Sequence, residues 1–289
     1  MRVLSVVIPA LNSASTISLT LFSIFSNNFP REMFEVLVVD NGSSDKTVEI
    51  AKKYPVKVFY CSKRGIGPPR NFGARMAQGE IVCFTDSDCV VGKDWLKRIF
   101  NFFHENPKAD GVGGPVFPYP HYQNKIQRLT GELFVEDQGY PKEITKVQFG
   151  SSHGIIFGSN SAYKREAFLS VGGYSEPGGS NLELAWRLAL KGRNLFFNPD
   201  LKVYHIFPTN LKAILKQQFR WGAQLTQMKR MHNVNKGLKE LIFIFYFPLR
   251  RLLFLINPKD LEKKLLHFTQ LASYSFGRLC GFRCASDET

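Results

Sequence analysis

The sequence is poor in cysteine. Five cysteines occur among 289 residues, at positions 61, 83, 89, 280 and 284, and no Cys-x-x-Cys pair is present. An odd number without paired spacing argues against a disulfide-stapled secreted scaffold and against a zinc ribbon. A reducing compartment is therefore the simpler interpretation of the cysteine content.

The sequence also lacks a secretory leader and an uninterrupted membrane span. A strand-like run starts at Val3 with no charged n-region and apolar h-region before it, so we expect the chain to stay in the cytoplasm. Leu241–Ile256 comes nearest to a span, but its seven initial apolar residues end at Pro248, and Arg250 and Arg251 interrupt the rest. A span needs about 20 apolar residues. Two interpretations remain, a helix lying in the membrane interface and a helix packed on the domain.

Acidic residues are scarce relative to basic ones. The chain has 24 Asp and Glu against 38 Lys and Arg, a formal net charge of +14. Much of the excess follows residue 190, beside the densest apolar stretches. This pairing favours a membrane surface over a nucleic-acid groove, for which no reading motif is present. A hydrophobic content of 44% and a mean hydropathy of -0.14 fit a globular chain.

Short apolar segments alternate with helical patterns along the chain. The expected strands are 3–8, 35–39, 56–60, 81–85, 111–118 and 202–206, and the expected helices are 13–25, 45–54, 69–77, 95–106, 182–191 and 211–231. This alternation predicts an α/β domain with a mostly parallel central sheet and helices on both faces. We expect that domain to cover residues 1–230, followed by a basic amphipathic helical segment at 231–289.

Polar motifs follow the first two expected strands. Pro9, Ala10 and Asn12 come after the first strand, and Asp40 follows the second. Ligands collect beyond the carboxyl ends of strands in an open parallel sheet, so these residues stand where a nucleotide would be held. Asp40 can accept from a base N–H or a ribose hydroxyl. The alternative is an ordinary turn or helix-capping aspartate.

A third motif, Asp86-Ser87-Asp88, directly follows the expected strand at 81–85. One or two carboxylates can hold Mg²⁺ or Mn²⁺, and such an ion neutralises a diphosphate. A single Asp-x-Asp is common by chance, but the strand before it and the two motifs upstream strengthen the signal.

A glycine-rich turn begins at Arg64 and leads into a helix N-terminus, which is a natural anion site. Arg70 can add a charge-assisted hydrogen bond there. An isolated Gly-x-Gly would more often be an ordinary turn, so this motif gains its weight from its neighbours.

In this order, the motifs resemble glycosyltransferase family 2, the inverting enzymes of the GT-A fold. The resemblance extends over about residues 3–221, and it continues in four later segments, Gly158–Arg165, Val171–Tyr174, Pro199–His205 and Gln217–Trp221. The last of these is similar to the Gln-x-x-Arg-Trp signature of processive or lipid-associated members.

The resemblance implies a nucleotide-diphosphate sugar as donor, with a UDP-sugar as first candidate, and Mg²⁺ or Mn²⁺ as cofactor. It implies a nucleotide-sugar half at 1–118 and an acceptor half at 119–230. The residues implied for nucleotide binding are Pro9, Ala10, Asn12, Asp40, Arg64, Arg70, Asp86 and Ser87. Those implied for the metal are Asp88 and His205, and those implied for the acceptor or sugar are Ser159, Asn160, Gln217, Arg220 and Trp221. His205 and Trp221 also have an ordinary interpretation as buried core residues.

One position departs from the family's pattern. The family carries Glu-Asp just before an Asp/Glu-x-x-x-Arg helix, and its aspartate removes the acceptor's proton. The matching pair here is Ser180-Asn181, and asparagine cannot act as a base at neutral pH. Three hypotheses stay open: Glu183 is the base, the acceptor is a lipid phosphate that needs none, or the site only binds. Asn181 can also simply cap the following helix. The catalytic candidates are thus Asn181, Glu183 and the metal-binding Asp88.

The sequence therefore predicts a metal-dependent inverting transferase. It would move a sugar to a membrane-lipid or glycan acceptor, as a peripheral protein at the cytoplasmic face of the cell membrane. The alternatives are a non-catalytic binder of nucleotide sugars or lipid phosphates, and a nucleotidyltransferase, which would release pyrophosphate. Nucleic acid is not an expected partner, and the sequence makes no prediction of the oligomeric state.

Overall fold

The computed structural model describes residues 3–147, 156–175, 181–231 and 261–283. The chain divides into two compact units, one formed by Met1–Tyr119 with Gly139–Ile206 and the other by Pro120–Gln138 with Phe207–Thr289. The expected domain boundary at residue 230 stays a prediction. The apolar segment 241–256 lies outside the described residues.

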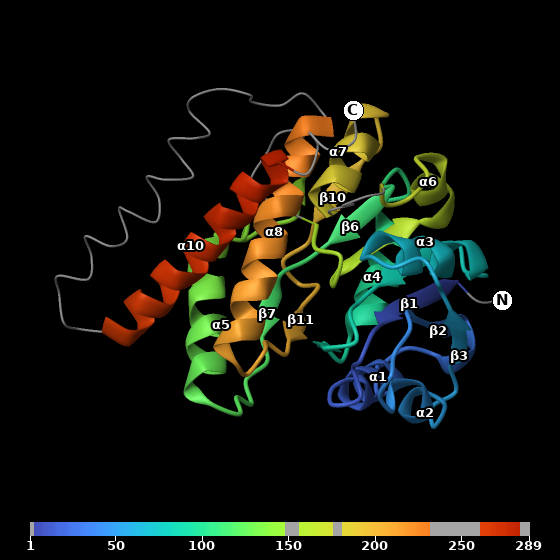
Figure 1. Cartoon of the computed structure of the whole chain (residues 1–289). Helices are drawn as coiled ribbons and strands as arrows, with labels where there is room; N and C mark the ends of the chain where they lie inside the picture. The colour runs from blue at the N-terminus through green and yellow to red at the C-terminus, as the bar shows by residue number, and fades with distance from the viewer. Residues whose placement is uncertain (1–2, 148–155, 176–180, 232–260, 284–289) are drawn as a thin grey trace. The chain divides into compact units, whose positions relative to one another are not determined.

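The first unit is built on an eight-stranded sheet in the order β3-β2-β1-β4-β9-β6-β10-β8. Its first four strands in that order are parallel, as the alternation of strands and helices predicts (Figure 1). Their bounds are Leu4–Ala10 for β1, Phe34–Asp40 for β2, Lys57–Tyr60 for β3 and Ile81–Phe84 for β4. The carboxyl ends of β1, β2 and β4 therefore point to one edge of the sheet.

The other half of the sheet mixes strand directions. It consists of β9 (Ser161–Lys164), β6 (Gly111–Gly113), β10 (Leu195–Phe197) and β8 (Thr145–Lys146). β9 runs antiparallel to both β4 and β6, and β8 runs antiparallel to β10. A small second sheet has the order β5-β11-β7, with bounds Cys89–Val91, Val203–His205 and Val116–Pro118.

Helices cover both faces of the large sheet, as predicted. One core joins the β1 side chains of Leu4, Val6 and Ile8 to α1 and α4. The other joins Val7 and Val39 to α3, α6 and α7. The alternation along β1 follows from the two-residue period of a strand. The helices of this unit are α1 (Ile17–Phe25), η1 (Arg31–Met33), α2 (Thr47–Ala51), α3 (Gly67–Met76), α4 (Trp95–Glu105), α6 (Arg165–Ser170) and α7 (Asn181–Leu190).

α3 lies unusually close to the sheet because of one glycine. A β-carbon on Gly73 would stand 2.3 Å from Cγ1 of Val7 and 3.1 Å from Cγ2 of Val39. No side chain fits at that distance, so glycine is required for this contact. The close packing fixes the helix that carries Arg70 against the strands that end at the candidate site.

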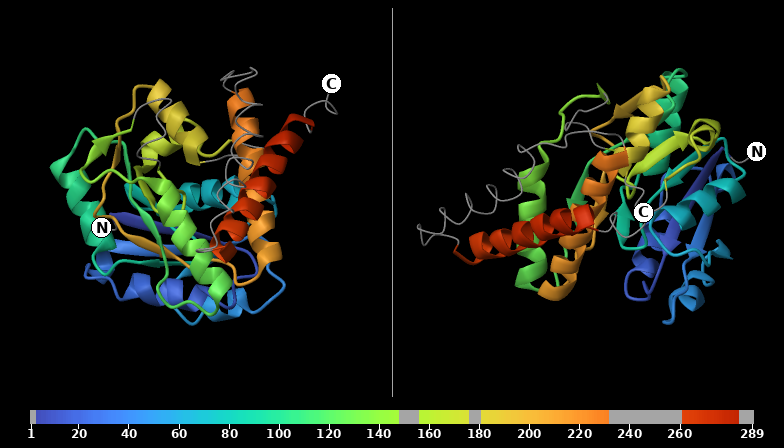
Figure 2. Two further views of the ribbon diagram at one scale, coloured as in Figure 1. Left: turned by 90° about the vertical axis from the view of Figure 1, so that its left-hand side faces the viewer. Right: turned by 45° about the horizontal axis from the view of Figure 1, so that its top comes forward.

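The second unit is helical. It contains α5 (Lys125–Gln138), α8 (Leu211–Met231) and α10 (Leu261–Arg283), and α10 contacts both α5 and α8 (Figure 2). α8 and α10 cross closely where Gly222 faces the carbonyl oxygen of Tyr274 and Gly277 faces that of Phe219. Within the described part of the chain, no helix has both the length and the apolar character needed to cross a membrane.

Candidate functional site

The end of β2 presents a buried carboxylate to the carboxyl edge of the sheet. Asp40 is the last residue of β2 and is only 5% exposed. Its Oδ2 accepts from the backbone N–H groups of Gly42 and Ser43, both at 3.1 Å. Ala10 lies beside Asp40 in the strand register, and Pro9 lies beside Val39. The carboxylate of Asp40 thus stabilises the turn that follows it. A ligand that bound this carboxylate would share it with the backbone N–H groups of that turn.

The loops after β1 and β2 are hydrogen-bonded to each other. The backbone N–H of Asn12 donates to Oγ of Ser43 (2.9 Å), and Oδ1 of Asn12 accepts from the backbone N–H of Ser44 (2.8 Å). Asn12 adopts a left-handed backbone with φ of 50°, which asparagine tolerates better than most residues. Asp45 reinforces the junction by accepting from the backbone N–H of Ala14 at 3.0 Å. The two loops therefore form one connected platform.

Arg70 and Asp86 form an ion pair at the same edge. Nη2 of Arg70 donates to Oδ1 of Asp86, and Nη1 of Arg70 donates to the carbonyl oxygen of Ile66 at 2.8 Å. The guanidinium also stands 5.6 Å from the ring centroid of Tyr174, a cation–π distance. Burial opposes the charge of Arg70, but the carboxylate of Asp86 outweighs it and raises the pKa of Arg70. The guanidinium is therefore a fixed positive charge of this site.

Asp88 meets His205 on the neighbouring small sheet. Nε2 of His205 lies 3.3 Å from Oδ2 of Asp88. Burial alone would raise the pKa of Asp88, but the charge and hydrogen bond of His205 bring it below the ordinary value. Burial likewise works against protonated His205, and Asp88 raises its pKa above the ordinary value. With Cys89, these two residues place three ligand atoms within 4.8 Å of one another.

A carboxylate oxygen and an imidazole nitrogen at this spacing fit a divalent cation. Oxygen ligands suit Mg²⁺ and Mn²⁺, and imidazole suits the later transition metals. The second-sheet pairing of β5 with β11 holds the set together, because Cys89 and His205 are direct cross-strand partners. The residues that the sequence assigned to the metal are thus close together in the structure.

The remaining donor-side candidates lie around this edge. Ser87 is buried, and its Oγ shares a 2.7 Å hydrogen bond with Oγ of Ser13, which ties the Asp-x-Asp motif to the loop after β1. Arg64 is exposed, and a β-carbon on Gly42 would stand 3.9 Å from its Nη2. The turn before α3 thus brings Arg64 close to the turn after Asp40.

The acceptor-side candidates include two side chains held by their own domain. Asn160 is 1% exposed; its Nδ2 donates to the carbonyl oxygens of Pro115 (2.9 Å) and Leu201 (2.5 Å), and its Oδ1 accepts from Trp95. Ser159 is half-buried beside it. The amide of Asn160 therefore shapes the loop from within, and its predicted role toward the acceptor stays a prediction.

Asn181 is the first residue of α7 and lies against the same loop. A β-carbon on Gly158 would stand 2.2 Å from Oδ1 of Asn181, so the side-chain amide occupies the space that glycine leaves open. This contact places the side chain of Asn181 directly beside the loop that carries Ser159.

Glu183, the alternative base, is fully engaged. It is 1% exposed, and its two carboxylate oxygens accept from Nε and Nη2 of Arg187 at 2.5 and 2.8 Å. Oγ of Ser175 donates a further hydrogen bond at 2.8 Å. Arg187 in turn donates to the carbonyl oxygens of Val171 and Gly173. The pair joins α7 to the turn after α6, which is a structural function.

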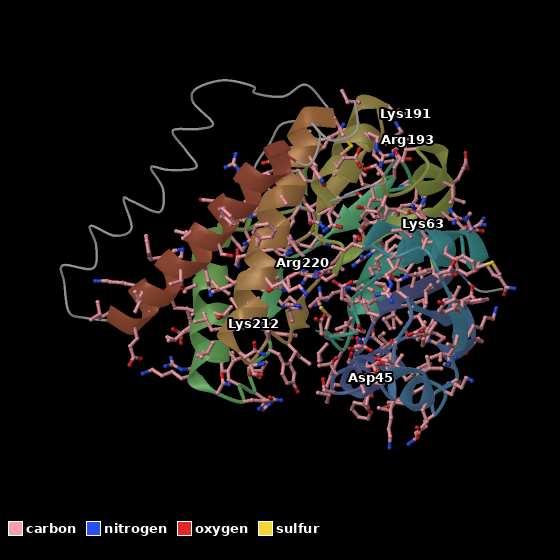
Figure 3. All side chains as sticks on the ribbon, viewed as in Figure 1. Asp45, Lys63, Lys191, Arg193, Lys212 and Arg220 are labelled. Carbon is pink, nitrogen blue, oxygen red and sulfur yellow. The ribbon has the colours of Figure 1, made fainter. Side chains whose placement is uncertain are left out.

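The last acceptor candidates lie on α8, in the helical unit. Gln217 and Trp221 are partly buried there and Arg220 is exposed; Figure 3 shows Lys212 and Arg220 on this helix. They belong to a different unit from Asp88, and their predicted role stays a prediction.

Sequence reasoning missed several residues that hold the site. Tyr174 carries the ring over Arg70, and its backbone N–H and carbonyl pair reciprocally with the side chain of Asn71 at 2.8 Å. Ser13 and Cys89 were also missed. Asn71 directly follows Arg70 in the sequence, but its partner Tyr174 is about a hundred residues away. Spacing alone therefore could not reveal that these two residues contact each other.

Comparison with solved structures confirms the fold. The mannosyltransferase PcManGT from Pyrobaculum calidifontis, solved with GDP-Man and Mn²⁺, matches 100% of this chain and 76% of its own with a TM-score of 0.62 at 20% identity. Staphylococcus aureus TarS, solved with UDP-GlcNAc, gives a TM-score of 0.60 at 18% identity over 99% of this chain and 92% of that one. The GT-A expectation is therefore confirmed.

Sequence comparison gives the family. The poly(ribitol-phosphate) beta-N-acetylglucosaminyltransferase TarS of S. aureus is 34% identical over 138 residues, 44% of this chain and 24% of TarS. Glycosyltransferase AglE of Haloferax volcanii is 36% identical over 131 residues, 43% of each chain, so the chain spans less than half of either relative's length. A dolichyl N-acetyl-glucosaminyl phosphate glucuronosyltransferase of Methanococcus voltae is 24% identical over 86% of this chain and 78% of its own.

The family model described as glycosyl transferase family 2 matches residues 5–172, more than half of the chain. The matched segment contains nearly all of β1, together with β2, β4 and the Asp-x-Asp motif, whereas His205 lies beyond it. The chain therefore belongs to glycosyl transferase family 2.

Proposed function

We propose that this protein is a metal-dependent inverting glycosyltransferase that uses a nucleotide-diphosphate sugar, with a UDP-sugar as first candidate. The observation that carries the proposal is the convergence of Asp40, the Arg70–Asp86 pair and the Asp88–His205 pair on one edge of the sheet. Ligands of open α/β sheets bind at this edge. Relatives solved with UDP-GlcNAc or with GDP-Man and Mn²⁺ share the fold and support the donor class.

Each donor-side residue has a defined task in this proposal. Asp40 accepts from the nucleoside, while Arg70 orients the carboxylate of Asp86 beside it. Asp88 and His205 would hold Mg²⁺ or Mn²⁺, which supplies positive charge for the diphosphate when bound. The hydrogen-bonded platform of Asn12, Ser43 and Ser44 needs little rearrangement, so binding the donor costs little ordering.

For the acceptor, we favour a phosphate group that is already ionised. Asn181 is neutral, and Glu183 spends both carboxylate oxygens on Arg187. Neither residue is suited to remove a proton, whereas a phosphate oxygen attacks without a base. A neutral amide beside the loop at Gly158 also avoids repelling such an anion. The acceptor would then be a lipid phosphate.

The helical unit supports membrane contact. The large side chains of Leu261, Leu265 and Phe276 on α10 are 48%, 52% and 61% exposed. Their spacing of four and eleven residues puts them on one face of the helix. We propose that this face touches the cytoplasmic side of the membrane, where a lipid phosphate would be presented.

The decisive experiment measures donor turnover. UDP-, GDP- and dTDP-sugars are incubated with Mn²⁺ and either a polyisoprenyl phosphate or the matching polyisoprenol, and the released nucleotide is identified. We expect nucleoside diphosphate only with the metal and the phosphorylated lipid. Release with the alcohol alone would refute the phosphate acceptor. Pyrophosphate released from a nucleoside triphosphate and a sugar 1-phosphate, supplied in a separate reaction, would identify a nucleotidyltransferase, and donor binding without release under all conditions would leave a binding protein.

A further inference from the structure

Cys89 is a third potential ligand beside the pair proposed to hold Mg²⁺ or Mn²⁺. Its Sγ lies 3.8 Å from Oδ1 of Asp88, and the ligand atoms of Asp88, Cys89 and His205 all lie within 4.8 Å of one another. The Mg²⁺ or Mn²⁺ ion of the proposed function needs only oxygen and nitrogen ligands. The proposed function therefore assigns no role to the thiol of Cys89.

The strand register explains why the thiol points to this place. Cys89 of β5 is the direct antiparallel partner of His205 of β11. Side chains of directly opposed residues stand on the same face of a sheet with β-carbons about 4.5–5.5 Å apart. Asp88 reaches the same point from the turn just before β5. Backbone geometry therefore sets the Cys–His spacing, and no side chain has to leave its strand position to reach a shared ion.

We propose that Asp88, Cys89 and His205 form a binding site for a thiophilic divalent cation, Zn²⁺ or Cd²⁺, which competes there with Mg²⁺ and Mn²⁺. This proposal rests on the metal-binding part of the proposed function and not on sugar transfer. One carboxylate, one imidazole and one thiolate match the three-ligand sites of zinc, which keep a fourth position for solvent or a ligand.

The chemistry of the exchange is simple. The thiol of Cys89 loses its proton to the solvent as its sulfur binds the ion, and the hard ion leaves with its own water ligands. Zn²⁺ binds mixed nitrogen, oxygen and sulfur ligands more tightly than Mn²⁺ does, because affinity rises along the first-row series and thiolate selects softer ions. Traces of Zn²⁺ would thus inhibit an enzyme that Mn²⁺ activates.

The chain offers matched controls. Cys83 is a fully buried thiol of β4, and Cys61 is a buried thiol whose Sγ approaches the carbonyl oxygen of Lys63 at 3.6 Å. Among the described residues, the ligand cluster contains neither of them. Cys83→Ser and Cys61→Ser therefore remove a thiol of the same domain while leaving the proposed site intact. A Cys280→Ser/Cys284→Ser double variant covers the two remaining cysteines.

The test is Cd²⁺ titration of the full-length protein, read by the ultraviolet charge-transfer absorption of a cadmium–thiolate bond. We expect one saturable equivalent in the wild type and in all three controls, and loss of the band in Cys89→Ser. Zn²⁺ affinity should fall by at least about tenfold in that variant, since even losing a residue that only orients a ligand costs this much. Mn²⁺ affinity, measured by electron paramagnetic resonance, should stay within about twofold.

A wild type without the band, or a Cys89→Ser protein that keeps it, would overturn the proposal. Should Cys89→Ser prove unfolded by circular dichroism, Cys89→Ala and displacement of wild-type Mn²⁺ by Cd²⁺ provide the same decision. A protein that binds Cd²⁺ through Cys89 and transfers no sugar leaves this inference standing while the proposed function fails. Metal-dependent transfer without a cadmium–thiolate band gives the reverse result.

Discussion

The donor side and the acceptor side of the first unit use their charged groups differently. On the donor side, Asp86 and Asp88 face basic partners at the open end of the sheet, with 31% and 40% of their side chains exposed. On the predicted acceptor side, Glu183 is closed off with 2% of its side chain exposed, and Asn181 stands at the position predicted for the base.

The contrast separates carboxylates that can meet a ligand from those that hold the fold. Asp86 and Asp88 each pair with one basic residue and have partly exposed side chains, whereas the buried carboxylate of Glu183 accepts hydrogen bonds from both Arg187 and Ser175. A family resemblance assigns site roles to all of these positions, but the structure leaves the side chains of Asp86 and Asp88 partly exposed and encloses that of Glu183. Substitutions in each half can break or sharpen this distinction.

The largest effect is expected for Asp88→Ala on the donor side. Removing the carboxylate takes a ligand from the proposed metal site, which contributes several kcal/mol of transition-state stabilisation. We expect transfer to fall by about a thousandfold or more, because each 1.36 kcal/mol is tenfold in rate. Steady-state release of nucleoside diphosphate measures it. Glu105→Ala, an exposed carboxylate at the end of α4, is the control and should retain full activity.

Glu183→Gln should act on stability rather than on chemistry. Breaking a buried ion pair by removing one partner costs about 3 kcal/mol, because Arg187 is left without its counter-charge. Chemical denaturation should show this loss, and the activity per folded molecule should stay within about threefold. A Glu183→Gln protein of normal stability whose turnover is abolished would instead make Glu183 the base.

Glu35 is the structural carboxylate of the donor half and provides a parallel to Glu183. Nζ of Lys57 lies 2.9 Å from Oε2 of Glu35, and Ser5 and the backbone of Gln78 donate to Oε1 at 2.7 Å. Burial alone would raise the pKa of Glu35, but these donors bring it below the ordinary value.

A carboxylate whose folded pKa is depressed stabilises the fold above its ordinary pKa and loses that contribution as pH falls through the folded value. Glu35→Gln should therefore cost about 1–2 kcal/mol at pH 7. The difference from the wild type should shrink as the pH falls below about 4. Urea denaturation at several pH values tests this, with the exposed Glu49→Gln as control. A pH-independent difference would contradict the assignment.

The smallest effect is expected for Asn181→Asp on the acceptor side. A negative charge beside the loop at Gly158 should repel an ionised phosphate, and we expect transfer to polyisoprenyl phosphate to fall about tenfold, about 1.4 kcal/mol. Transfer to the matching alcohol, which we expect to be absent in the wild type, should remain absent. Faster transfer to the phosphate would show that an aspartate base is useful here and would favour a hydroxyl acceptor.

The sequence predicted the donor half of the fold well because its signals are local. Each strand of the parallel part is a short apolar run followed by its functional residue, so Asp40 and the Asp-x-Asp motif could be placed at strand ends before any contact was known. The same rule predicted no element between residues 119 and 150, where apolar and polar residues are mixed along α5. β9 was missed because its four residues pair with β4, about eighty residues earlier, rather than with a neighbour in sequence.

The sequence predicted which residues form the site better than it predicted which of them contact one another. Asp88 and His205 could be named from motifs, but the cross-strand pairing that aims Cys89 at them depends on a register between segments more than a hundred residues apart. The capture of Glu183 by Arg187 was visible as a four-residue helical spacing, yet burial decides whether such a pair is structural. The close glycine crossing of α8 with α10 likewise joins segments about fifty residues apart, which spacing alone does not reveal.

The fit of Asn181 against Gly158 has a consequence for how this lineage can change. Because the side-chain amide fills the space of an absent β-carbon, the two positions are not free to mutate independently. Any larger residue at 158 would first require a smaller one at 181, so a path between acceptor classes passes through a particular order of substitutions. Natural relatives should therefore carry these two positions as correlated pairs.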